Sequence, residues 1–126
     1  MPRLSIVIAA YNVSAELRIL LDSLRLSRFQ DFEVCICDDA SCDDTSRVAQ
    51  SYADRFLLHL TANKDTQGVR RTRNCALTLA QAPLLLFLDA DVRLQPDTID
   101  HLLDRLERTG ADVVEGVYSA TALDPG

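Results

Sequence analysis

The sequence predicts an α/β domain in which helices cover both faces of a mostly parallel sheet, a Rossmann-like three-layer α/β/α arrangement. Short apolar runs, typical of buried strands, alternate along the chain with stretches whose apolar residues recur at helical spacing. Repeated strand–helix units favour parallel pairing, because each helix returns the chain to the end of the sheet at which the strands begin. The length of 126 residues suits a single domain with a core of its own.

The first three elements follow from apolar pattern and capping residues. Leu4 to Ala10 is the first predicted strand, and Phe32 to Cys37 is the second. Between them, Ser14 can cap a helix. The apolar face of that helix contains four leucines at helical spacing, Leu17, Leu20, Leu21 and Leu24.

The middle of the chain repeats this order. Either Ser41 or Asp43 can cap a helix that reaches about Tyr52, and Phe56 to Leu60 reads as a short third strand. Gly68 precedes the next helix, which Pro83 stops. The positions that give this helix its pattern are Val69, Arg73, Ala76, Leu77 and Ala80.

The last part of the chain begins with a fourth strand, Leu84 to Leu88, whose unbroken apolar run predicts burial on both faces. Pro96 suits the first turn of a helix that Gly110 ends. The apolar residues of this helix are Ile99, Leu102, Leu103 and Leu106. Val113 to Tyr118 is a fifth extended segment.

Composition excludes several classes of function. The net charge of -6 argues against a nucleic-acid surface, because few basic groups are available to displace phosphate counterions. The amino terminus lacks the pattern of an export signal, and no apolar run approaches the roughly 20 residues of a membrane helix. We therefore expect a cytoplasmic protein, and the sequence leaves peripheral contact with the inner face of the membrane open.

The cysteines and histidines do not predict a metal site. Cys35 and Cys37 alternate with apolar residues, so both thiols should lie on one face of a strand as small core residues. Cys42 and Cys75 complete the set without a paired Cys-x-x-Cys motif. The two histidines, His59 and His101, stand in ordinary strand and helix patterns, which favours structural or solvated positions.

Polar residues follow the predicted strands at their carboxyl ends, where ligands bind in open parallel sheets. They are Tyr11 with Asn12, then Asp38 with Asp39, then residues 61–67, then Asp89 with Asp91. Carboxylates as close as Asp89 and Asp91 repel each other unless a cation lies beside them. A divalent metal that carries phosphates is a common solution.

These motifs together resemble the family 2 inverting glycosyltransferases, which have the GT-A fold and bind nucleotide-diphosphate sugars. The matching segments are residues 5–12 (SIVIAAYN), residues 34–41 (VCICDDAS), Arg73-Asn74 and the Asp89-Ala90-Asp91 (DXD) motif. The order and spacing of the four segments agree with the family nearly from end to end of the chain.

The resemblance implies roles for individual residues. Ala9 and Tyr11 would contact the base of a UDP- or dTDP-sugar, and the carboxylate of Asp39 would accept a hydrogen bond from a pyrimidine N–H. Asp89 would lie near the ribose or the metal. Asp91 would bind the metal itself, Mn²⁺ or Mg²⁺.

The resemblance also concerns the diphosphate and the loops around it. One or more of Arg70, Arg71 and Arg73 would face the diphosphate, with Arg73 in the matched motif. Asp38 would hold the loop by capping the next helix. The acceptor is open: a sugar, a lipid or a protein.

The chain departs from the family pattern at three places. Ala40 replaces the usual glycine after the Asp-Asp pair, and Asp65-Thr66-Gln67-Gly68 replaces the commoner Asn-x-Gly. The family places its catalytic base and much of its acceptor site beyond the position of Gly126, so no base is assigned here. We therefore expect residues 1–126 to correspond to the donor-binding, N-terminal portion of a longer enzyme. The chain is either a shortened form of such an enzyme or a short natural protein that retains only this portion.

Three other functions can be weighed against the sequence. A phosphatase of the haloacid dehalogenase type would use Asp89 as nucleophile and Asp91 as general acid, but it needs this motif near the amino terminus and a lysine downstream. A receiver domain would need an acidic pair after its first strand, where Tyr11 and Asn12 stand. A non-catalytic nucleotide-sugar-binding module also fits, and a parent sequence with an acidic base would distinguish the enzyme from it.

Overall fold

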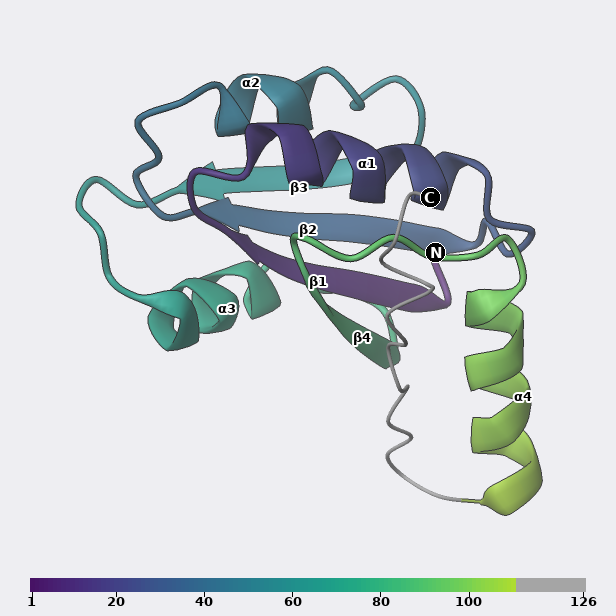
Figure 1. The fold of residues 1–126 in the computed structure, drawn as a ribbon. Helices are drawn as coiled ribbons and strands as arrows, with labels where there is room; N and C mark the ends of the chain where they lie inside the picture. The colour runs from purple at the N-terminus through teal and green to yellow at the C-terminus, as the bar shows by residue number, and fades with distance from the viewer. Residues whose placement is uncertain (111–126) are drawn as a thin grey trace.

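The computed structural model describes residues 1–110, and strands and helices alternate throughout them (Figure 1). The elements are β1 (Leu4–Ala10), α1 (Ser14–Arg25), β2 (Phe32–Asp38), α2 (Thr45–Gln50), β3 (Leu57–Ala62), α3 (Val69–Leu77), β4 (Leu84–Asp89) and α4 (Thr98–Thr109).

The four described strands form one parallel sheet in the order β3-β2-β1-β4. In the central strand β1, Ile6 lies between Val34 of β2 and Leu86 of β4. The chain first builds outward from β1 through β2 to β3 and then returns to the other side of β1. Strand order therefore reverses between β1 and β4, and ligands bind parallel sheets at the carboxyl side of such a point.

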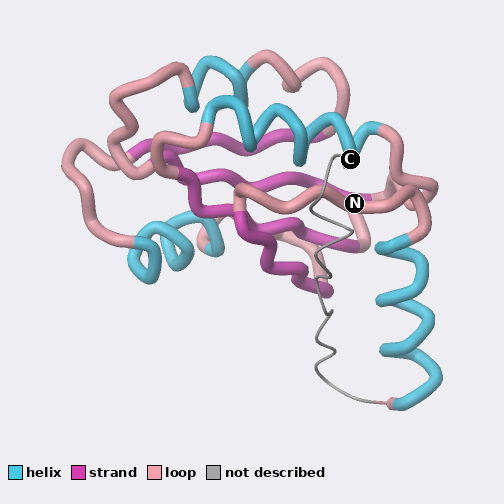
Figure 2. The backbone as a smooth tube through the Cα atoms, viewed as in Figure 1, coloured by secondary structure: helices cyan, strands magenta, loops and turns pink. Residues whose placement is uncertain are grey.

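Helices cover the two faces of the sheet unequally, as Figures 1 and 2 show. Helices α1 and α2 lie on one face. The four predicted leucines of α1 are buried in the main core, together with Ile6, Ile8, Val34 and Ile36 of the sheet. Helix α3 lies on the other face against β1 and β2, where Val7, Cys37 and Ala76 form a smaller core. The three-layer α/β prediction is confirmed, as is the burial of Cys35 and Cys37.

Helix starts differ from the predicted caps. Ser14 is the first residue of α1, and neither α1 nor α2 has a side-chain cap at its N-cap residue. Asp43, one of the two caps predicted for α2, lies just before that N-cap residue, and its Oδ1 accepts from the amide of Thr45, the first residue of α2, at 3.0 Å. The neighbouring loop supplies partners instead, because the Val13 amide donates to Thr45 Oγ1 at 3.0 Å and the Ser14 amide to Asp43 Oδ2 at 3.3 Å. The loops after β1 and β2 thus satisfy each other's backbone.

The prediction that β4 is buried on both faces is wrong within residues 1–110. Leu88 is buried, but Leu85 is 45% and Phe87 43% exposed. The reason is that α3 packs on β1 and β2, while β4 is the edge strand of the described sheet. Val113 to Tyr118, the predicted fifth segment, lies outside the described residues.

Helix α4 lies beyond the amino ends of the strands, after a loop that crosses back over the sheet (Figure 1). Its only fully buried residue is Ile99, and Gly110 ends it in the left-handed conformation at φ 65°, as predicted. Arg3 joins it to the start of the chain through Glu107, at 2.8 Å. No helix within residues 1–110 is both long enough and apolar enough to cross a membrane.

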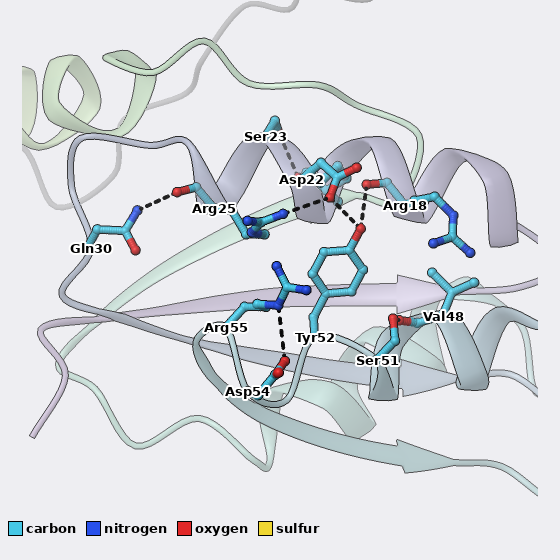
Figure 3. Close-up of polar contacts among 11 residues, drawn as sticks. Arg18, Asp22, Ser23, Arg25, Gln30, Val48, Ser51, Tyr52, Asp54 and Arg55 are labelled. Carbon is cyan, nitrogen blue, oxygen red and sulfur yellow. Dashed lines mark hydrogen bonds and ion pairs between the residues drawn. The ribbon is translucent and has the colours of Figure 1, made fainter.

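A tyrosine connects the two helices on the main face (Figure 3). The hydroxyl of Tyr52, just after α2, donates to Asp22 Oδ1 at 2.6 Å and lies 3.3 Å from the carbonyl oxygen of Arg18, both on α1. Burial and the Asp22 carboxylate raise the pKa of Tyr52 to about 12. The phenol therefore stays protonated and keeps donating at neutral pH.

A buried carboxylate organises the amino-end half of the sheet. Glu33 of β2 is fully buried, and its Oε2 accepts from the Ser5 hydroxyl and from the Gln81 amide at 2.6 Å. Its Oε1 lies 2.8 Å from Nε2 of His59 on β3, and Ser5 Oγ in turn accepts from the Ala82 amide at 3.0 Å. The network joins three strands to the turn before β4, which gives His59 a structural role.

Burial raises the pKa of Glu33, but hydrogen bonds from Ser5, the Gln81 amide and His59 outweigh it, so the pKa lies below its ordinary value of 4.5. The carboxylate is therefore charged at neutral pH, in a position without solvent contact. Such a group is stable only while its partners remain in place.

Candidate functional site

Asp39 is the polar centre of the site. It follows β2 directly and is 3% exposed. Its Oδ1 accepts from Asn63 Nδ2 at 2.9 Å and from the Gln67 amide at 2.7 Å, and its Oδ2 accepts from the Gly68 amide at 3.0 Å. All three donors come from the loop between β3 and α3, so this loop wraps around the carboxylate.

These donors determine the charge of Asp39. Burial raises its pKa, but the hydrogen bonds from Asn63, the Gln67 and Gly68 amides and the Thr72 hydroxyl together lower it below the ordinary 3.8. The carboxylate is thus ionised at neutral pH. A negative charge with little contact to water is a strong acceptor for a ligand N–H.

The carboxylate lies in the wall of an open pocket of about 200 Å³. The other lining residues are small or apolar except for two threonines: Ala9, Ala10, Tyr11, Thr66, Gly68, Val69 and Thr72. Tyr11 is 48% and Val69 63% exposed, so both can cover a flat ring that enters the pocket. The predicted residues Ala9, Tyr11 and Asp39 are therefore brought together.

Gly68 shapes this wall at the start of α3. Its φ is 95°, a region that residues with a Cβ rarely adopt, although a Cβ there would meet no atom within 4 Å. Glycine is thus required by backbone conformation rather than by space. The turn points the Gly68 amide at Asp39 and leads into the helix.

Asp38 points into the loop before α2 and holds it. Its Oδ1 accepts from the Ser41 amide at 3.2 Å and from the Ser41 hydroxyl, and its Oδ2 accepts from the hydroxyl of Ser46 in α2. Ala40, between Asp38 and Ser41 in the chain, adopts φ 59°, which explains why a glycine suits this position. Asp38 thus holds this loop, as expected, but through Ser41 and the Ser46 hydroxyl rather than by capping the backbone of α2.

Asn12, after β1, completes the loop arrangement. It adopts φ 49°, which asparagine tolerates better than most residues. The side-chain oxygen of Asn12 accepts from the Cys42 backbone amide at 2.7 Å, and the backbone amide of Asn12 donates to Ser41 Oγ at 2.8 Å. The loop that presents Tyr11 is thereby attached to the loop after Asp39.

The second polar group lies at the end of β4. Asp89 pairs with Arg73 of α3, with 3.8 Å between Oδ1 and a guanidinium nitrogen. Both side chains are well exposed, at 65% for Asp89 and 44% for Arg73, and Asp91 is exposed beside them. Arg71 donates instead to Gln67 Oε1 at 3.3 Å, and Arg70 is exposed.

The residues that sequence reasoning did not single out are Asn63 and Thr72. Asn63 directly follows β3, so its place on the polar rim was foreseeable, but its contact with Asp39 depends on strand register. Thr72 lies inside α3 and is 1% exposed, at a position that helical pattern alone assigns to the core.

A parallel sheet with this polar rim at the carboxyl ends of its strands has the GT-A type of α/β fold. The sequence model of glycosyl transferase family 2 matches residues 5–123, and the chain belongs to this family.

Known proteins are similar over most of the chain. The putative glycosyltransferase EpsH of Bacillus subtilis is 29% identical over 99% of this chain, and a validoxylamine A glucosyltransferase of Streptomyces hygroscopicus is 39% identical over 81%. The crystal structure of Staphylococcus aureus TarS 1–349 in complex with UDP is 27% identical and matches 89% of this chain with a TM-score of 0.81. The chain spans only 36% of EpsH, 25% of the glucosyltransferase and 34% of the TarS chain.

Proposed function

We propose that this chain is the donor-binding part of an inverting glycosyltransferase that uses a nucleotide-diphosphate sugar. The observation that carries the proposal is the ionised carboxylate of Asp39 in the wall of a mostly apolar pocket beside Tyr11. An apolar pocket with one strong acceptor suits a pyrimidine, which has flat faces and an N–H on its edge.

The base would bind through stacking and one edge contact. Tyr11 supplies an exposed ring, and stacking on an aromatic side chain is worth about 1–3 kcal/mol per base. Each carboxylate oxygen accepts about two hydrogen bonds. Asp39 Oδ1 already has two, whereas Oδ2 has one, from Gly68, so Oδ2 would accept from the base. TarS, solved with UDP, supports UDP or a related pyrimidine nucleotide.

The diphosphate would lie between the start of α3 and the end of β4. The amino end of α3 carries partial positive charge, which favours phosphate. Arg73 lies 3.8 Å from Asp89 at the carboxyl end of β4, and its exposed guanidinium can reach a ligand. We assign it the first contact with the diphosphate, and Arg70 the second.

The chemistry of Asp89 and Asp91 fits a divalent metal, Mn²⁺ or Mg²⁺. Within residues 1–110 no group of three or more metal-ligating side chains comes together, so these carboxylates alone would not form a closed protein cage. Magnesium is usually bound by one or two carboxylates together with substrate phosphates, which is the donor set available here. When bound, such a metal would neutralise the charge of the departing diphosphate.

Catalysis of transfer and the choice of acceptor would depend on other parts of the enzyme. We propose that residues 1–126 correspond to the donor-binding domain of a longer enzyme, since the relatives that the chain matches are about three to four times longer. A cytoplasmic location with contact to the inner face of the membrane would place the domain where activated sugars are made.

Equilibrium titration with UDP, uridine and ADP tests this function. We expect UDP to bind more tightly than uridine, because the diphosphate adds contacts. UDP should also bind more tightly than ADP, because uracil offers Asp39 a ring N–H, whereas the ring nitrogens of adenine are acceptors. EDTA should weaken UDP binding without affecting uridine. Equal affinity for UDP and ADP, or no binding of any nucleotide, would contradict the proposal.

A further inference from the structure

The side chain of Asn63 lies between three polar groups that the proposed function does not by itself connect. Its backbone amide donates to the Asp38 carbonyl at 2.8 Å, which extends the pairing of β3 with β2 by one residue. The Cα atom of Asn63 is thus held beside the start of the Asp39 loop. From there the side chain reaches Asp39, Cys37 and Thr72.

The partners determine the orientation of the Asn63 amide. Nδ2 donates to Asp39 Oδ1 at 2.9 Å and to Thr72 Oγ1 at 3.2 Å, while Oδ1 lies 3.6 Å from the Cys37 thiol and accepts from it. If the amide were turned over, its oxygen would face a carboxylate. Asparagine fits because one planar group supplies a donor on one side and an acceptor on the other.

Two neighbours of this amide are buried. Cys37 has no solvent exposure and Thr72 is 1% exposed. Burial raises the pKa of the Cys37 thiol to about 12, and Cys75 and the carboxylates of Asp39 and Asp38 add to this effect. The thiol therefore stays protonated at neutral pH and remains a donor to Asn63.

Among the groups that donate to Asp39, Asn63 is the one that uses a side-chain amide, since Gln67 and Gly68 donate through the backbone and Thr72 through its hydroxyl. We propose that Asn63 is a positioning residue that fixes the orientation and negative charge of the Asp39 carboxylate. The relevance of this role to nucleotide binding rests on the proposed function. Asn63 does not need to touch the nucleotide to affect its affinity.

The test combines a direct reading of Asp39 with nucleotide binding. Asn63→Ala removes the donor, and Asn63→Asp replaces it with a second carboxylate. The titration of Asp39 is followed by carboxyl-carbon NMR without nucleotide, and UDP affinity is measured by calorimetry from pH 4 to pH 8. Gln30→Ala is the control, because that amide also makes several hydrogen bonds, to carbonyls of residues 24, 25 and 27, but far from the pocket.

We expect the pKa of Asp39 to rise in Asn63→Ala and to rise further in Asn63→Asp. UDP affinity at pH 7 should fall about tenfold in Asn63→Ala, the effect of one hydrogen bond to a charged group. The loss of affinity on acidification should begin at a higher pH than in the unmodified chain. Gln30→Ala should keep both the Asp39 pKa and the affinity even where its melting temperature falls.

Cys37→Ala provides a second test with Asn63 intact. It removes the thiol that orients the amide, and we expect a smaller rise in the Asp39 pKa and a smaller loss of affinity. This variant also serves if Asn63→Ala does not fold.

Failure of the two proposals is distinguishable. If the unmodified chain does not bind UDP but the Asp39 pKa rises in Asn63→Ala, the positioning role is supported and the proposed function is refuted. A protein that binds UDP, loses binding in Asp39→Asn, yet keeps its affinity and Asp39 pKa in both Asn63→Ala and Cys37→Ala would overturn the positioning role.

Discussion

Replacing the buried carboxylate of Glu33 should cost a large part of the stability of this domain. Glu33→Ala removes the acceptor of the Ser5 hydroxyl, the Gln81 amide and the His59 ring, and leaves the buried hydroxyl of Ser5 without its acceptor. Hydrogen bonds to a charged group are worth about 1.5–3 kcal/mol each. Relief of the cost of burying the carboxylate offsets part of this loss.

The expected net loss for Glu33→Ala is about 2–4 kcal/mol, since removing one partner of a buried pair costs about 3–5 kcal/mol and the side chain of His59 is 31% exposed. Glu33→Gln has nearly the same shape, and its oxygen can still accept from Gln81 and Ser5. Its amide can donate to Nε2 of His59 once the ring adopts the tautomer with its proton on Nδ1. We expect a cost of about 1 kcal/mol for it. Urea unfolding at pH 7, followed by circular dichroism, measures both.

The pH dependence of stability tests the role of Glu33 independently. Because folding lowers the pKa of Glu33, its stabilising contribution is present above 4.5 and is lost as the pH falls through the folded-state value. The stability difference between the unmodified chain and Glu33→Gln should therefore shrink below pH 4.5. A Glu33→Ala variant within about 0.5 kcal/mol of the unmodified chain, as for a surface substitution, would refute the reasoning.

Three further predictions concern single positions. Ala40→Gly should stabilise the chain by about 0.5–1 kcal/mol in thermal unfolding, because glycine relieves the left-handed φ of 59° at some cost in unfolded-state entropy; a lower melting temperature would contradict this. Tyr52→Phe should cost about 1 kcal/mol at pH 7 through the lost hydrogen bond to Asp22, and the difference should shrink above pH 10, since folding raises the tyrosine pKa to about 12; a constant difference up to pH 12 would argue against that bond. Asp91→Asn should abolish the Mn²⁺-dependent part of UDP binding without loss of stability, and Asp89→Asn should reduce it less; a destabilised Asp91→Asn with unchanged metal dependence would identify a structural role instead.

The sequence was most informative where a pattern depends on local spacing. The strand at Leu4–Ala10 and the leucine face of α1 were predicted because alternation and helical periodicity are properties of consecutive residues. Polar residues at the ends of strands also identified Tyr11 and Asp39, which line one pocket together with Ala9, a residue that the family resemblance added. The parallel topology then placed them on the same rim.

The features that were missed depend on distant parts of the chain. The exposure of Phe87 follows from which strands α3 covers, and the first turn of α1 is satisfied by a loop about 30 residues away. Glu33 stands inside an apolar run, and its partners lie on β1, on β3 and before β4. The contact of Asn63 with Asp39 likewise requires the register of β3 against β2, which no local pattern contains.

The most direct measurement of the central claim is UDP affinity in the unmodified chain and in Asp39→Asn, with Asp22→Asn as the matched control far from the pocket. We expect affinity to fall about 10- to 100-fold in Asp39→Asn, because a charged acceptor of the base is removed, and to stay unchanged in Asp22→Asn. An Asp39→Asn variant that remains folded and binds UDP within about twofold of the unmodified chain, well below what one charged hydrogen bond contributes, would contradict it.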